Sequence, residues 1–126
     1  MKNMKKHYHI KAQVEDVFTA LTNPLTIEMW TGATAVMEAV EGTEFSLWDG
    51  EITGLNLEIV KDEKLKQQWY FEGEEGTSVV TITLFPEGKE TRVEVLHLDI
   101  PDEAFENIVD GWDRYYFKPL KQLLED

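Results

Sequence analysis

The stretch DEAFENIVDGWDRYYFKPLKQL, residues 102–123, predicts the longest helix of the chain. At 100° per residue, its apolar side chains fall within a stripe about 120° wide, and charged side chains lie off it. The stripe contains Phe105, Ile108, Val109, Trp112, Tyr116, Leu120 and Leu123. Pro119 lacks an amide hydrogen and crowds the carbonyl four residues earlier, so we expect a kink near Tyr115. Asp102, directly after Pro101, is the expected N-cap.

Trp112 lies in the middle of the stripe and is the expected central anchor of the helix. Gly111 beside it has no side chain, so we expect a neighbouring backbone to approach closely there. The tryptophans either pack in the core or line a cavity, and core packing is the commoner role of such residues. They are Trp30, Trp48, Trp69 and Trp112.

The segments before this helix predict an antiparallel sheet. Apolar and polar residues alternate in a first strand and again in a ladder of short runs separated by polar turns. These runs are residues 4–12, 35–39, 44–48, 51–60, 65–71, 78–85 and 91–100. Asp49-Gly50 favours a tight type I′ turn, in which both residues have positive φ. Helical spacing at residues 14–21 and 25–30 predicts two short helices after the first strand, separated by Asn23-Pro24.

This order of elements predicts one α+β domain over residues 1–126. An antiparallel sheet of about six or seven strands would wrap around the C-terminal helix, because both need to cover an apolar face. The space between the helix and the sheet is the natural place for a pocket.

The charge of the chain limits its partners. Of 126 residues, 12 are Lys or Arg and 25 are Asp or Glu, which gives a net charge of −13. Phosphate backbones and anionic lipids would be repelled, so we expect no nucleic acid and no membrane partner. The absence of cysteine excludes a thiol nucleophile and a thiolate metal site. Without a signal peptide or an apolar span, the expected location is cytoplasmic.

Four segments resemble a known family. They are VFTALT (17–22) with WTG (30–32), FSLWDGEITG (45–54), KQQWYF (66–71) and GWDRYYFKPLK (111–121). They resemble the START-like (SRPBCC) helix-grip superfamily and, within it, the C-terminal domain of the activator of heat-shock-protein-90 ATPase. The resemblance implies a sheet that grips the long helix. Relatives hold lipids, hormones or polyketides in the cleft, whereas the activator binds a chaperone mainly through a separate N-terminal domain. Tyr70 stands where the activator pattern is basic.

We therefore expect a non-enzymatic binding domain that holds a small apolar ligand between the sheet and the C-terminal helix. The alternative is a co-chaperone-like protein-interaction domain with a chaperone partner, although we expect little stimulation of a chaperone ATPase. No cofactor, metal or catalytic residue is predicted, and the oligomeric state is left open. The expected ligand-binding residues are Trp30, Phe45, Trp69, Phe71, His97, Ile108, Trp112 and Tyr116.

Among the polar residues, His97 is the best candidate for a chemical role. It shares the strand face of Val93 and Val95, whereas Leu96, Leu98 and Ile100 favour the opposite face. His97 could orient a ligand or act as a general base, but a structural, hydrogen-bonded histidine is favoured because no spacing supplies an orienting partner.

Other polar groups point to no specific chemistry. His7 and His9 share a strand face and could hold a metal, but a third ligand is lacking, so a solvated face is favoured. The acidic residues Glu72, Glu74 and Glu75 do not have the spacing of a calcium loop and are expected in a solubilising turn.

Overall fold

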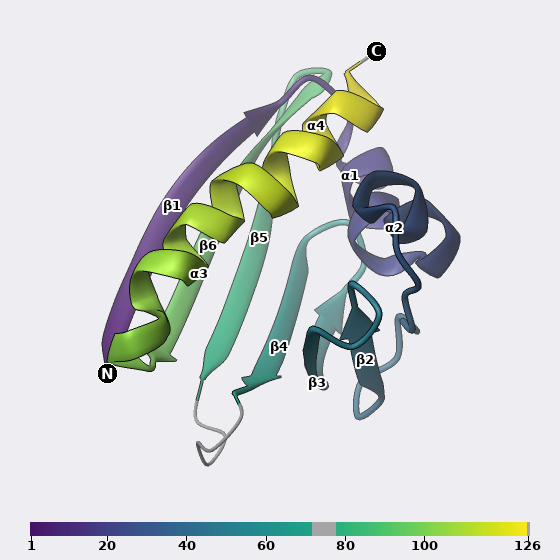
Figure 1. The fold of residues 1–126 in the computed structure, drawn as a ribbon. Helices are drawn as coiled ribbons and strands as arrows, with labels where there is room; N and C mark the ends of the chain where they lie inside the picture. Colours follow the sequence, from purple (N-terminus) through teal and green to yellow (C-terminus); the bar gives the residue numbers. More distant parts are fainter. Residues whose placement is uncertain (72–77, 126) are drawn as a thin grey trace.

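The computed structural model describes residues 1–71 and 78–125 (Figure 1). The acidic turn containing Glu72, Glu74 and Glu75 lies outside the described residues. The strands are β1 (Lys2–Ile10), β2 (Glu44–Leu47), β3 (Ile52–Val60), β4 (Lys64–Tyr70), β5 (Val79–Glu87) and β6 (Glu90–Ile100). The α-helices are α1 (Val14–Thr22), α2 (Pro24–Thr31), α3 (Phe105–Gly111) and α4 (Lys118–Leu124).

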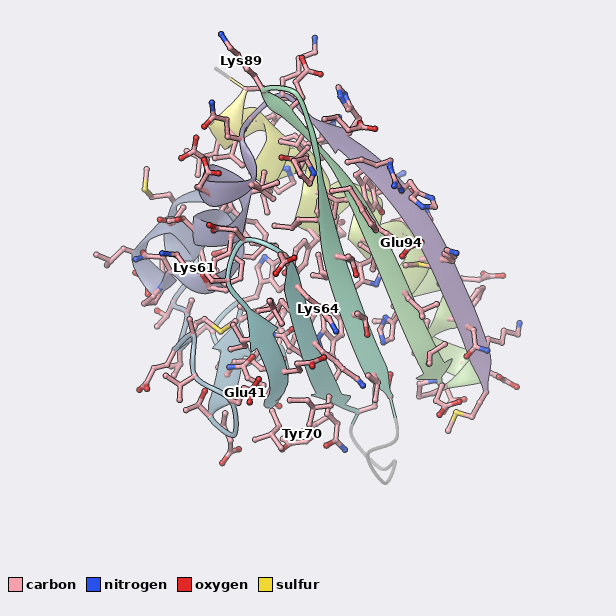
Figure 2. The ribbon with its side chains drawn as sticks, turned by 180° about the vertical axis from the view of Figure 1, so that it is seen from behind. Glu41, Lys61, Lys64, Tyr70, Lys89 and Glu94 are labelled. Atoms are coloured by element: carbon pink, nitrogen blue, oxygen red, sulfur yellow. The ribbon has the colours of Figure 1, made fainter. Side chains whose placement is uncertain are left out.

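The six strands form one antiparallel sheet in the order β1-β6-β5-β4-β3-β2. The C-terminal helical segment lies across one face of this sheet, and α1 and α2 lie near α4, at the C-terminal end of that segment (Figure 1). The opposite face carries polar side chains such as Lys64 and Glu94 (Figure 2). The predicted α+β helix-grip fold is confirmed.

The C-terminal helix is irregular near Tyr115, where Pro119 led us to expect a kink. A 3₁₀ turn (Asp102–Ala104) leads into α3, and a π-helical turn (Trp112–Phe117) joins α3 to α4. Pro119 lies in the first turn of α4, where its missing amide hydrogen costs least. The kink was expected near Tyr115, and a π-helical turn, a rare element found mostly as a single turn within an α-helix, contains this residue.

The predicted cap at the start of this helix was wrong. No side chain caps the 3₁₀ turn that Asp102 begins. Asp102 instead forms an ion pair with the ammonium group of Met1, at 2.8 Å. This ion pair connects the helical segment to the start of β1 rather than stabilising the first helical turn.

The predicted strand at residues 35–39 is reduced to one bridge. Val36 and Ser46 exchange two backbone hydrogen bonds of 2.9 Å. The amide of Ala35 donates instead to the carboxylate of Glu28, at 3.0 Å. The segment therefore follows the edge of β2 without a continuous ladder. The predicted turn at Asp49-Gly50 is confirmed, with φ values of 53° and 92°.

A bulge in β6 explains the conflicting alternation around His97. Asp99 has a φ of 57°, and the pairing with β1 shifts by one residue between Lys2 and Met4. The extra residue lets both His97 and Ile100 point into the core, because the side-chain period of two is interrupted between them. The alternation that places His97 with Val93 and Val95 is therefore confirmed, whereas Leu96 and Leu98 remain half-buried on the opposite face.

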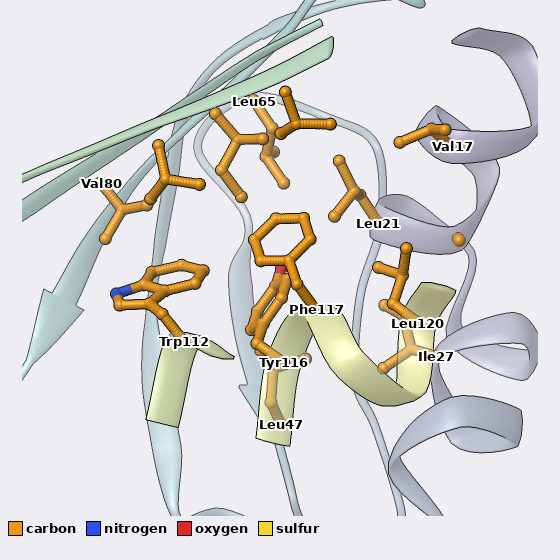
Figure 3. Close-up of a cluster of buried hydrophobic side chains, with 14 of the residues drawn as sticks. Val17, Leu21, Ile27, Leu47, Leu65, Val80, Trp112, Tyr116, Phe117 and Leu120 are labelled. Atoms are coloured by element: carbon orange, nitrogen blue, oxygen red, sulfur yellow. The ribbon is translucent and has the colours of Figure 1, made fainter. Parts of the chain in front are cut away.

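The core occupies much of the space between the sheet and the helix. Trp112, Tyr116, Phe117 and Leu120 of the helical segment are buried in one cluster with residues of the sheet and of α1 and α2 (Figure 3). The predicted apolar stripe is confirmed at its centre: Trp112 is only 2% exposed.

Close backbone approach occurs at Gly54 in β3 rather than at Gly111. A Cβ atom at Gly54 would clash with the carbonyl oxygen of Gln68 and would lie 2.7 Å from the ring of Phe45. At Gly111 the nearest such atom belongs to Tyr115, at 4.0 Å, an ordinary contact. The expectation for Gly111 was therefore wrong.

This difference predicts opposite effects of two alanine substitutions. Gly54→Ala should lower the free energy of unfolding by at least about 2 kcal/mol, because backbone and a packed ring must move. Gly111→Ala should leave stability unchanged or raise it by up to about 1 kcal/mol, because alanine favours a helix. Urea unfolding of both variants checks the contrast, and equal losses would contradict the close packing at Gly54.

Candidate functional site

A cavity of about 260 Å³ lies between the C-terminal helix and the β2–β3 end of the sheet. Its lining is mostly apolar, with an amide and a carboxylate. The lining residues are Trp48, Glu51, Ile52, Trp69, Asn107, Ile108, Gly111, Trp112, Tyr115 and Tyr116. Tyr115 is 61% exposed, so the cavity opens to solvent at the helix.

The helix supplies its side of the cavity through two adjacent rows at a spacing of four residues. Residues 108, 112 and 116 form the inner row, and residues 107, 111 and 115 form the outer row. Between Ile108 and Tyr116 the helix changes from α to π geometry. The irregular turn thus belongs to the wall of the cavity.

Aromatic rings in contact with each other build the deeper wall. Trp69 of β4 and Trp112 stack with ring centroids 5.0 Å apart and planes 22° apart. Tyr116 lies against Trp112 at 4.6 Å and against Trp48 at 6.0 Å. Such contacts add to the stability that burial alone provides, so the rings are held firmly.

His97 fixes Trp112 from behind. The indole Nε1 of Trp112 donates to Nδ1 of His97, at 3.1 Å. An indole nitrogen can only donate, so Nδ1 must be unprotonated and the neutral ring carries its proton on Nε2. That proton is donated to the hydroxyl of Ser78, at 2.9 Å, and the hydroxyl donates to the carbonyl of Leu98, at 3.1 Å.

A second chain of hydrogen bonds fixes Trp69. Its indole Nε1 donates to Oε1 of Gln67, at 3.1 Å. The amide nitrogen of Gln67 donates to Asn56 Oδ1, at 2.9 Å, and Asn56 donates in turn to the carbonyl of Glu38, at 3.2 Å. In the described residues, no buried side-chain nitrogen or oxygen lacks a hydrogen-bond partner. Both members of the stacked pair are thus anchored by polar groups.

The chemistry open to His97 is limited by this arrangement. Burial lowers the pKa of His97 to about 4, because the charged ring would lose its hydration. Both ring nitrogens are engaged within the core, and His97 does not line the cavity. The favoured structural role therefore fits the geometry better than the general-base alternative.

The structure brings together four of the eight predicted ligand-binding residues. Trp69, Ile108, Trp112 and Tyr116 line the cavity.

The other four, Trp30, Phe45, Phe71 and His97, do not line it. The ring centroids of Trp30 and Tyr116 lie 4.9 Å apart. The indole Nε1 of Trp30 donates to the carbonyl of Ala20, at 2.8 Å. Phe45 packs over Gly54, and the ring centroids of Phe71 and His97 lie 6.3 Å apart.

Six lining residues were not among the expected ligand-binding residues, although cavity lining had been the alternative role for Trp48. Asn107, Gly111 and Tyr115 each precede a predicted stripe residue, so a wider stripe would have included them. Trp48, Glu51 and Ile52 flank the Asp49-Gly50 turn, whose position over the cavity depends on tertiary packing.

The two exposed histidines face carboxylates. Nε2 of His7 lies 3.3 Å from Oε1 of Glu94, and Nε2 of His9 lies 2.7 Å from Oε1 of Glu90. Within residues 1–71 and 78–125, no group of three metal-binding side chains occurs. No helix in the described part of the chain has the length and apolar character needed to cross a membrane.

Comparison with known proteins places the chain in a family. Residues 11–125 match the family model described as Activator of Hsp90 ATPase homolog 1-like protein. The chain belongs to this family. It is 30% identical over 123 residues to an activator of 90 kDa heat shock protein ATPase homolog from Dictyostelium discoideum, covering 95% of this chain and 32% of that protein. The mouse homolog 1 is 29% identical over 110 residues, covering 86% of this chain and 32% of that protein.

The fold is shared with a solved relative. The crystal structure of a Plasmodium falciparum protein described as an HSP90 activator has a TM-score of 0.91 and 23% identity, covering 99% of this chain and 97% of that one. The chain spans about a third of the length of the curated relatives it matches. The suspected START-like assignment is confirmed.

The buried imidazole leads to a prediction for titration by NMR. Nitrogen chemical shifts should show His97 neutral, with the proton on Nε2, down to about pH 5, because its pKa is about 4. An unfolded imidazole has a pKa near 6.5, so the folded state binds fewer protons between those values. The protonation of His97 should therefore lower the free energy of unfolding by about 3 kcal/mol as the pH drops from 6.5 towards 4. A His97 signal that titrates near pH 6.5 in the folded protein would contradict the buried hydrogen bonds.

Proposed function

We propose that this domain binds a small apolar molecule in the cavity between the C-terminal helix and the sheet. The observation that carries the proposal is the cavity itself, which has a volume of about 260 Å³ and is lined by five aromatic side chains among ten residues. Ligand pockets are typically concave and apolar, with a few polar groups that orient the ligand. Asn107 and Glu51 are the polar members of this lining.

The rigidity of the wall supports the same proposal. Trp112 and Trp69 are each held by a buried hydrogen bond, so they lose little freedom when a ligand packs against them. Tyr115 is exposed and forms an edge of the opening. A preformed pocket with one exposed ring is suited to a flat or compact ligand about the size of an aromatic ring system.

The test uses indole, a neutral apolar probe, followed by ¹H–¹⁵N NMR. Indole should perturb the amides of Asn107 and Gly111 and the side-chain signal of Trp48 in a saturable way. Tyr115→Ala should weaken binding several-fold, because it removes one lining ring from an exposed position. Tyr70→Ala is the matched control, since Tyr70 is also exposed but does not line the cavity. Shifts that do not saturate, or that are scattered over the sheet, would refute the proposal.

A second candidate function is binding to a chaperone of the 90 kDa heat-shock class. It is supported by the relatives from mouse and Dictyostelium, whose names describe them as activators of that chaperone's ATPase. An ATPase titration of such a chaperone from the same organism tests it. A saturable rise in the steady-state rate would support this candidate, and a flat titration would remove it.

A further inference from the structure

We propose that the ligand of this cavity is a small organic cation with an apolar surface, of the quaternary ammonium class. This inference rests on the proposed function, because it names the ligand class of the same cavity. Two features of the lining support it, the aromatic rings and the negative charge of Glu51.

The rings provide the first part of the argument. Trp48, Trp69, Trp112, Tyr115 and Tyr116 all line the cavity. Because Trp69 and Trp112 stack on each other, the half-buried Trp48 and the exposed Tyr115 offer the most free ring surface. Tryptophan and tyrosine attract cations through the negative potential of their ring faces, and several such rings together are the usual means of binding quaternary ammonium groups. A quaternary ammonium group has no hydrogen to donate, so a cavity with few polar atoms does not leave it with unmet hydrogen bonds.

The charges provide the second part. Glu51 is the charged side chain among the described lining residues, and no lysine or arginine occurs in that lining. The guanidinium of Arg114, the residue before Tyr115, is paired with Asp110, at 3.1 Å. With a net charge of −13, the whole chain also attracts cations and repels anions. An anionic ligand would therefore meet unfavourable charge both at the cavity and at long range.

The test compares choline with 3,3-dimethylbutan-1-ol, its neutral isostere, in the same NMR titration at low ionic strength. Both have the same shape, so their difference reports the charge. Choline should bind about tenfold more tightly, the effect of a cation on a partly desolvated aromatic site. Glu51→Gln should weaken choline binding several-fold and leave the isostere unchanged. Glu44→Gln is the matched control, because this exposed carboxylate on β2 carries the same charge and does not line the cavity.

The outcomes separate this inference from the proposed function. If choline and its isostere bind equally, or if indole binds and choline does not, the cation class is overturned and the apolar cavity stands. If choline, the isostere and indole all fail to bind, both proposals are overturned. A preference for choline that Glu44→Gln reduces as much as Glu51→Gln would assign the effect to the net charge of the protein, and this too would overturn the inference.

Discussion

An uncharged imidazole joins the C-terminal helix to β6, the strand next to the β1 edge of the sheet. His97 of β6 accepts a hydrogen bond from the Trp112 indole with one nitrogen and donates to Ser78 with the other. A protonated ring could not accept the first bond and would be costly to bury. The hydrogen bond that connects the helix to the sheet at Trp112 thus depends on the protonation state of His97.

The same hydrogen bond positions the wall of the cavity. Trp112 stacks on Trp69, which a separate polar chain through Gln67 holds in place. Buried polar groups whose bonds are all made tend to specify one arrangement of a core. The π-helical turn that accompanies Pro119 lies in this wall as well. The sequence features that shape the helix therefore also shape the binding site.

Much of the fold could be predicted from periodicity, whereas the site could be predicted only in part. Alternation and helical spacing report which faces are buried, and this defined the sheet and the long helix. The face of His97 was ambiguous because a bulge at Asp99 interrupts the alternation, and a bulge leaves no clear signature in one sequence. Similarly, Trp48 reaches the cavity through the packing of a turn, which local pattern does not encode.

Hydrogen exchange of the tryptophan indole N–H groups tests the central role of the His97–Trp112 hydrogen bond most directly. The Trp112 N–H is buried and bonded, so it should exchange only when the whole domain unfolds, with a protection free energy equal to the global free energy of unfolding. The Trp48 N–H, from a half-buried side chain at the cavity, should exchange far faster. If the Trp112 N–H exchanged as fast as that of Trp48, the helix would open from the sheet independently of global unfolding, and the account would be contradicted.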